Sequence, residues 1–258
     1  MNFKDYFSGS AQNYAAVRPV YPEELFIFLV SLTGFKRKAW DCATGSGQAA
    51  ISVAKYFEVV EATDASREQI KNAIPGSRVH YSVQPAEKTS FPADTFDLVT
   101  VAQALHWFEL KKFYREVKRV LKPNGIFAAW GYSFFKINPE LDALFKNLVF
   151  EPLEPYWARE NRLLWDGYRN IPFPFTEIPA PEFGIELNYS LQELLGFIET
   201  WSGVRTYLQQ RDNNFMQTVK ESILPAWCRA SEKRKISMQL FLKVGANTAI
   251  DRGETSFD

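Results

Sequence analysis

The residues best suited to chemistry lie in one short turn and at the end of the next expected strand. Asp41 precedes a glycine turn, Gly45-Ser46-Gly47, and Asp64 follows 17 residues after Gly47. Glycines let the backbone pass close to a ligand where a β-carbon would collide, and a turn that opens a helix aims free amides at whatever binds there. An acid at the end of the following strand suits a bidentate hydrogen bond to the two hydroxyls of a ribose. The pattern therefore indicates a cofactor that contains adenosine.

Two classes of cofactor fit this turn. The run Gly45-Ser46-Gly47-Gln48-Ala49-Ala50 satisfies the nicotinamide dinucleotide pattern G-x-G-x-x-A. Asp41 favours the other class, because a carboxylate repels a pyrophosphate and attracts the α-ammonium of a methionyl group. The expected strand also follows the basic run Phe35-Lys36-Arg37-Lys38, whereas a dinucleotide turn usually follows a long apolar strand. We favour S-adenosylmethionine over NAD, and an NAD-dependent oxidoreductase remains the alternative.

The composition excludes several classes of protein. The 258 residues carry 30 Lys and Arg against 30 Asp and Glu, whereas a protein held to nucleic acid needs a basic face. The longest apolar stretch, residues 25–30, is far shorter than the ~20 residues that span a bilayer. The first residues lack a signal-peptide pattern, and Cys42 and Cys228 form neither a disulfide framework nor a zinc motif. We expect a cytoplasmic protein with no nucleic-acid partner, no membrane partner and no metal.

The elements around the turn alternate between strands and helices. A helix is expected between Pro22 and Gly34, where apolar residues recur at helical spacing. Five strands interleaved with helices indicate a doubly wound parallel sheet that is covered on both faces. These strands are expected at 39–43, 59–63, 78–83, 96–101 and 126–130.

The alternation stops after residue 131. Residues 137–170 have a helical pattern with tryptophans, and residues 190–230 are expected to form two more helices. The apolar run 236–244 is expected to return as an edge strand.

Motifs spread over most of the chain complete a known pattern. They are Tyr14…Arg18-Pro19, Asp41 to Gly47, Asp64, Ala86-Glu87, Ala102-Gln103-Ala104-Leu105-His106-Trp107-Phe108, Leu121-Lys122-Pro123-Asn124-Gly125 and Thr200-Trp201-Ser202. On these residues the chain resembles the class I S-adenosylmethionine-dependent methyltransferases. Within them it is most similar to the type 11, small-molecule group typified by trans-aconitate and juvenile hormone acid methyltransferases.

The resemblance implies an α/β fold and a division of the chain. The fold would be a Rossmann-like, doubly wound, seven-stranded and mostly parallel sheet, with a helical lid inserted toward the C-terminus. Residues 1–34 would form an arm and a helix that cover the cofactor, and residues 35–132 the α/β core that binds it. Residues 133–246 would form the helical lid, the substrate region and the returning edge strands, and residues 247–258 a flexible tail.

The resemblance also implies which residues hold S-adenosylmethionine. They are Tyr14, Arg18, Asp41, Ala43, Gly45, Gly47, Asp64, Ala65, Ala86, Glu87, Ala102 and Gln103. Asp64 would hold the ribose hydroxyls, Glu87 the exocyclic amine of adenine, and Gln103 the methionyl ammonium. Ala43 stands where the family often has a glycine. An alanine there costs little if its φ is negative, and we expect it to be tolerated.

His106 is the candidate catalytic residue, because it follows the fourth strand at the ligand-binding edge of the sheet and its type suits a general base. A histidine among aromatic residues also often only packs. Trp107, Tyr132 and Trp201 are the candidate substrate contacts. The segment from Gln103 to His106 stands where N-methylating classes have Asn-Pro-Pro-Tyr, which argues against them.

The expected reaction is in-line methyl transfer to a small molecule, by O-methylation and with a carboxylic acid as the favoured acceptor. S-adenosylhomocysteine would be the product. A non-catalytic domain that binds S-adenosylmethionine is a further alternative.

Overall fold

The computed structural model describes residues 19–211 and 214–248. Five strands form a parallel sheet in the order β3-β2-β1-β4-β5. They are β1 (Lys38–Cys42), β2 (Val59–Asp64), β3 (Val79–Val83), β4 (Phe96–Ala102) and β5 (Leu121–Tyr132). The first four agree with the predicted strands to within one residue at each end. β5 begins earlier than predicted, because Leu121 already pairs with Phe96.

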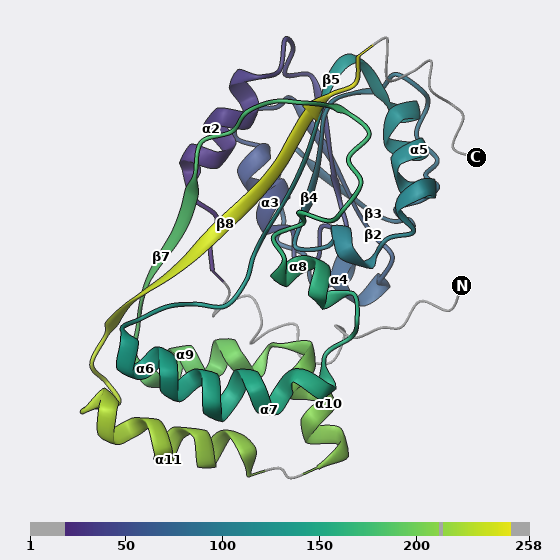
Figure 1. Cartoon of the computed structure of the whole chain (residues 1–258). Helices are drawn as coiled ribbons and strands as arrows, with labels where there is room; N and C mark the ends of the chain where they lie inside the picture. Colours follow the sequence, from purple (N-terminus) through teal and green to yellow (C-terminus); the bar gives the residue numbers. More distant parts are fainter. Residues whose placement is uncertain (1–18, 212–213, 249–258) are drawn as a thin grey trace.

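Helices cover both faces of this sheet, as predicted (Figure 1). The helices of this half are α2 (Glu23–Ser31), α3 (Gln48–Val53), α4 (Arg67–Lys71) and α5 (Leu110–Val120), with a short 3₁₀ turn, η2 (Leu105–Trp107). Alternate residues of β5 point to opposite faces: Ile126 and Ala128 belong to the core under α2 and α3, and Phe127 and Ala129 to the core under α5. The sheet is therefore buried on both sides.

Three antiparallel strands complete an eight-stranded sheet, one strand more than predicted. They are β6 (Thr176–Glu177), β7 (Phe183–Tyr189) and β8 (Arg234–Ala246). The prediction of a Rossmann-like, mostly parallel fold is confirmed, whereas the prediction that 236–244 forms an edge strand is wrong. β8 pairs with β5 on one side and with β6 and β7 on the other.

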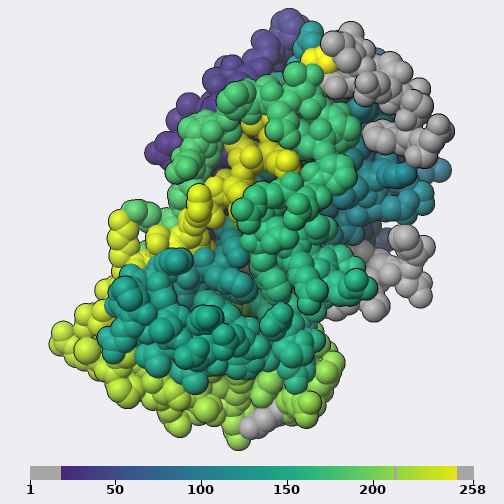
Figure 2. Space-filling view, viewed as in Figure 1, coloured from purple at the N-terminus to yellow at the C-terminus, as the bar shows by residue number. Residues whose placement is uncertain are grey.

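A layer of helices lies beyond one end of the sheet, where β7 and β8 reach it (Figure 1). Its members are α6 (Pro139–Phe145), η3 (Lys146–Phe150), α7 (Glu151–Leu153), η4 (Glu154–Tyr156), α9 (Leu191–Glu199), α10 (Ser202–Gln210) and α11 (Phe215–Trp227), while α8 (Asn161–Trp165) sits between this layer and the sheet. Residues 190–230 form three helices where two were predicted, because Trp201 is extended (ψ 139°) and separates α9 from α10. The space-filling view shows the layer as a block packed below the sheet (Figure 2).

The chain remains anchored past β8. Asn247 is fully buried, and its side-chain amide donates to the backbone carbonyls of Lys118, Leu121 and Lys122. Residue 247 was predicted to be the first of a flexible tail, and for Asn247 this prediction is wrong. Within the described residues, no helix has the length and apolar character needed to cross a membrane.

Candidate active site

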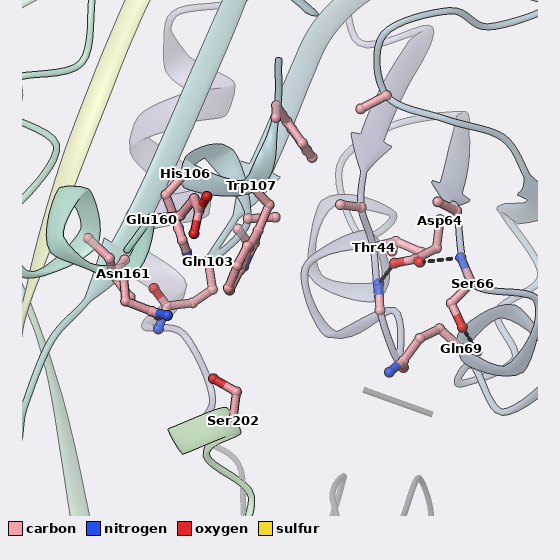
Figure 3. Close-up of a pocket in the computed structure, with 18 of the residues that line it drawn as sticks. Thr44, Asp64, Ser66, Gln69, Gln103, His106, Trp107, Glu160, Asn161 and Ser202 are labelled. Carbon is pink, nitrogen blue, oxygen red and sulfur yellow. Dashed lines mark hydrogen bonds between the residues drawn. The ribbon is translucent and has the colours of Figure 1, made fainter. Parts of the chain in front are cut away.

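The loop after β1 is tied to the end of β2. The two strands are parallel neighbours, so their carboxyl ends meet at one edge of the sheet. One oxygen of Asp64 accepts a hydrogen bond from the backbone amide of Gly45 at 2.9 Å, and the other accepts one from the amide of Ser66 at 2.8 Å (Figure 3). Both carboxylate oxygens are thereby oriented, and each keeps lone pairs for a ligand hydroxyl.

Gly47 begins α3 in a conformation that favours glycine. Its φ is +85°, and a β-carbon there would lie 2.2 Å from the Tyr81 hydroxyl oxygen. That hydroxyl donates to the carbonyl of Ile74 at 2.6 Å, so Tyr81 is held in place. Gly47 does not line the cavity, and its role in the structure is to let the loop turn beside Tyr81.

Ala43 has a φ of +53°, so the negative φ at which an alanine costs little is not adopted. The left-handed region costs a residue with a β-carbon roughly 1–2 kcal/mol. The loop needs this conformation to leave β1, and Ala43 lines the cavity. The loop thus has a strained residue where the family often has a glycine.

Asp41 is set back from the cavity. Its side chain is buried, and its carboxylate accepts hydrogen bonds from the hydroxyls of Thr44 at 2.5 Å and Thr100 at 2.8 Å. Burial, only partly opposed by these bonds, raises the pKa of Asp41 to about 6. Asp41 is absent from the cavity wall, so in this structure it supports the loop from behind.

Glu87 and Gln103 are each fixed by a backbone group. A carboxylate oxygen of Glu87 accepts from the amide of Glu109 at 3.1 Å. The side-chain amide of Gln103 forms two bonds with Tyr132, accepting from its N–H at 3.0 Å and donating to its carbonyl at 3.2 Å. The backbone N–H of Gln103 donates to the carbonyl of Trp130 at 2.9 Å, so the backbone carbonyl, at a residue with φ +57°, is what Gln103 can offer to a ligand.

His106 lies on the cavity wall with only 4% of its surface exposed. Its Nδ1 is 3.1 Å from the hydroxyl of Tyr168, a residue 62 positions later in the chain. Burial lowers the pKa of His106 to about 3, so the imidazole is neutral at pH 7. A ring with such a pKa accepts a proton poorly.

One cavity of about 990 Å³ connects these groups. In Figure 3, Thr44, Asp64, Ser66 and Gln69 lie on one side, and Gln103, His106, Trp107, Glu160 and Asn161 gather on the other. The predicted site residues on its wall are Ala43, Gly45, Asp64, Ala65, Ala86, Glu87, Ala102, Gln103, His106, Trp107, Tyr132 and Trp201. Asp41 and Gly47 are off the wall, and Tyr14 and Arg18 lie outside the described residues.

The sequence analysis did not assign a second set of wall residues. Those nearest the aromatic end are Phe134, Trp157, Glu160, Asn161, Leu164, Trp165, Phe197 and Ser202. Their abundance of tryptophan was visible in the sequence, but aromatic residues fill cores by default. The segment after β5 and the placement of α8, α9 and α10 bring them to the cavity.

The comparisons with known proteins agree with this geometry. A family model described as a methyltransferase domain matches residues 40–129. A protein of Dictyostelium discoideum that carries the name methyltransferase is 34% identical over 229 residues, which are 87% of this chain and 87% of that one. A structure described as a type II methyltransferase from Anaeromyxobacter dehalogenans superposes with a TM-score of 0.83 at 34% identity, over 90% of this chain and 98% of that chain.

The chain belongs to the class I S-adenosylmethionine-dependent methyltransferases. A Saccharomyces cerevisiae protein named for the same activity is 28% identical over 137 residues, half of this chain and 46% of the relative. Membership in this family excludes the alternative of an NAD-dependent oxidoreductase. It also identifies this protein as a methyl-transferring enzyme, which argues against the other alternative, a non-catalytic binding domain.

The site of this methyltransferase suits the methyl donor of its family. Asp64 presents a doubly oriented carboxylate, which matches two adjacent ribose hydroxyls. Glu87 presents a second fixed carboxylate across the same cavity, and a carboxylate can accept from an exocyclic amine. Acidic walls also suit a donor that carries a sulfonium and an ammonium.

Proposed function

We propose that this methyltransferase transfers a methyl group to an oxygen of a small molecule, and that the acceptor is a carboxylic acid. The observation that carries the proposal is the single cavity with two unlike ends: the loop after β1 and Asp64 at one end, and an aromatic wall from the helical half at the other. A cavity of about 990 Å³ is of the size that takes small ligands.

In this proposal the cofactor end holds the donor through groups fixed before it binds. Asp64 accepts from the ribose hydroxyls, Ala65 and Ala86 lie against adenine, and Glu87 accepts from its amine. The backbone at Ala102 and Gln103 faces the methionyl group, and Asp41 supports it from behind the loop. When bound, S-adenosylmethionine would supply a methyl group on a sulfonium, open to direct attack by a nucleophilic oxygen, with S-adenosylhomocysteine as the leaving group and no covalent enzyme intermediate.

The aromatic end would hold the body of the acceptor. Phe134, Trp165, Trp157 and Trp201 form a continuous set of rings, with neighbouring centroids 5.6 to 6.0 Å apart. Together with Trp107 and Tyr132 they would orient an apolar acceptor and exclude water. The lid role of the helices in 133–246, and the covering of the cofactor by residues 1–34, are part of the same proposal.

A carboxylic acid fits this end because it is ionised at pH 7 and needs no base. His106 is neutral and has a pKa of about 3, so it is a poor partner for an alcohol that must lose its proton. The side chain of Gln103 is bonded to Tyr132 and takes no part in deprotonation.

The test uses S-adenosylmethionine labelled in its methyl group and a panel of small aliphatic and aromatic carboxylic acids, each paired with its alcohol. Methyl esters release labelled methanol in alkali, whereas methyl ethers and N-methyl groups do not. We expect alkali-labile product from an acid with an apolar body. Stable product, formed only from alcohols or amines, would contradict the proposed acceptor.

A further inference from the structure

Tyr168 occupies an unusual and fully buried position behind His106. It follows α8 with a φ of +58°, a conformation that bulky residues rarely adopt. None of its surface is exposed, and it packs edge-on against Phe241 with centroids 5.1 Å apart. Burial raises the pKa of Tyr168, so the phenol keeps its proton.

The buried hydroxyl of Tyr168 must place that proton on an acceptor, because an unmade hydrogen bond is costly away from water. A backbone N–H cannot take this proton, because an amide N–H is a donor. Across the described part of the chain, the acceptor within hydrogen-bonding distance of this hydroxyl is Nδ1 of His106, at 3.1 Å.

A hydroxyl that donates to Nδ1 determines the tautomer of a neutral imidazole. With Nδ1 as acceptor, the single ring proton resides on Nε2. Nε2 has no hydrogen-bond partner among the residues that the structure describes, and the ring lines the cavity while Tyr168 does not.

We propose that Tyr168 is a positioning residue that locks His106 as an Nε2–H donor toward the acceptor, so that His106 holds an ionised oxygen of the substrate rather than removing a proton. This inference rests on the proposed function and deepens it. One oxygen of an acceptor carboxylate accepts the Nε2–H bond while the other attacks the methyl carbon. The new O–C bond forms as the S–C bond breaks, the electron pair goes to sulfur, and no proton is transferred.

The protonation of His106 can be observed without any acceptor. The chain contains two histidines, and His80 lies on β3 as an exposed side chain, so it provides a reference signal from a solvent-exposed ring. In protein with ¹⁵N-labelled histidine rings, we expect the His106 signal to show a protonated Nε2 and an unprotonated Nδ1 from pH 5 to 8. The variant His106→Gln assigns the signal by removing it. A wild-type spectrum with the proton on Nδ1 would overturn the proposal whether or not any variant folds.

Tyr168→Phe removes the hydroxyl and keeps the ring. We expect the His106 pattern to change to a mixture of tautomers while the thermal shift with S-adenosylhomocysteine is retained. An unchanged pattern in this variant would overturn the role of Tyr168.

Measurements of turnover distinguish a hydrogen-bond donor from a general base at position 106. The Nε2 amide of glutamine can donate from the place of the imidazole Nε2–H, so His106→Gln should keep kcat/KM within about 5-fold of wild type. His106→Phe should lose roughly 10-fold to 100-fold, as expected for a lost hydrogen bond to a charged group. Equal losses in both variants would indicate a base and overturn the proposal. Failure to methylate any acid would end the proposed acceptor class, while the ring spectrum would still report the tautomer.

Discussion

The carboxylate of Asp64 and the backbone amide of Gly45 are joined by a 2.9 Å hydrogen bond across 19 residues of sequence. The same carboxylate also accepts from Ser66, the residue that caps α4 through its side chain. The acid proposed to hold the ribose therefore also fastens the loop that faces the donor. Loss of this one side chain removes two supports at once.

Asp64→Ala should weaken binding of S-adenosylhomocysteine by roughly 10-fold to 100-fold, because hydrogen bonds to a charged group are lost. The free energy of unfolding should fall by about 1–3 kcal/mol, since two backbone amides lose their acceptor. Calorimetric titration and chemical denaturation measure the two effects. Glu61→Ala, on the same strand and paired with the exposed His80, is the matched control and should leave affinity unchanged. Undiminished affinity in Asp64→Ala would remove the ribose assignment.

Gly47→Ala should lower the free energy of unfolding by about 2–5 kcal/mol. A left-handed φ costs roughly 1–2 kcal/mol, and overpacking against the Tyr81 hydroxyl adds about 1–3 kcal/mol. Tyr81→Phe deletes the nearest atom, so the same alanine should cost less in that background. Urea denaturation of the wild type, the two single variants and the double variant measures the coupling free energy between residues 47 and 81. Equal costs of Gly47→Ala in both backgrounds would show that the Tyr81 hydroxyl does not determine the preference for glycine.

Ala43→Gly should stabilise the protein by up to about 1.5 kcal/mol. Relief of the positive φ is worth roughly 1–2 kcal/mol, and the greater freedom of glycine in the unfolded chain returns about 0.5–1 kcal/mol. Ala49→Gly, within α3, should instead destabilise by about 1 kcal/mol. A loss of stability in Ala43→Gly would show that the side chain contributes packing that outweighs the strain.

Asp41 should make the protein less stable as the pH rises from about 4 to about 6. Its folded pKa, about 6, is above its ordinary value of 3.8, so in this window the folded state binds more protons than the unfolded state. Asp41→Asn removes this ionisation and should gain on the order of 1–3 kcal/mol over wild type above pH 6. Denaturation curves from pH 4 to 8 measure the difference, which should shrink toward pH 4. A constant difference would contradict the raised pKa.

His106 should have the opposite effect on the pH dependence of stability. Its folded pKa, about 3, is below its ordinary value of 6.5, so the unfolded chain binds more protons and stability falls as the pH is lowered from about 6.5 toward 3. His106→Gln should lose less stability than wild type over this range, measured by the same denaturation series. If the stability of the two proteins changed in parallel with pH, the pKa of His106 would not be lowered, and its ring would be in a more polar environment than the structure shows.

The half of the cavity proposed to hold the cofactor was predictable because it depends on local order along the chain. A strand, a glycine turn and an acid at the end of the next strand specify one edge of a parallel sheet, and the structure places Gly45 and Asp64 in contact there. The sequence could not show that Ala43 is left-handed, since alanine ordinarily avoids that region. Nor could it show that Asp41 lies behind the loop, because that depends on Thr100 from another strand.

The half of the cavity proposed to hold the acceptor was less predictable because its parts meet through tertiary packing. Tyr168 carries no motif, and it reaches His106 only because α8 folds back beside η2. The aromatic wall combines Phe134, which follows β5, with tryptophans from α8 and its neighbouring segments. Strand β8 was recognised as apolar, but its pairing on both sides depends on partners far away in sequence.

Strand β8 extends from the parallel sheet to the layer of helices (Figure 1). The strand pairs with β5 along one half and with β7 along the other, and α9, α10 and α11 are all inserted between β7 and β8. This ladder of backbone hydrogen bonds therefore supports the inserted helices, and with them Trp201, at a set distance from the parallel strands. Such a ladder can be lengthened only in steps of two residues, about 7 Å, if inward and outward faces are to be kept. Relatives that accept longer molecules should therefore differ by even-numbered insertions in this ribbon, with the cofactor loop left as it is.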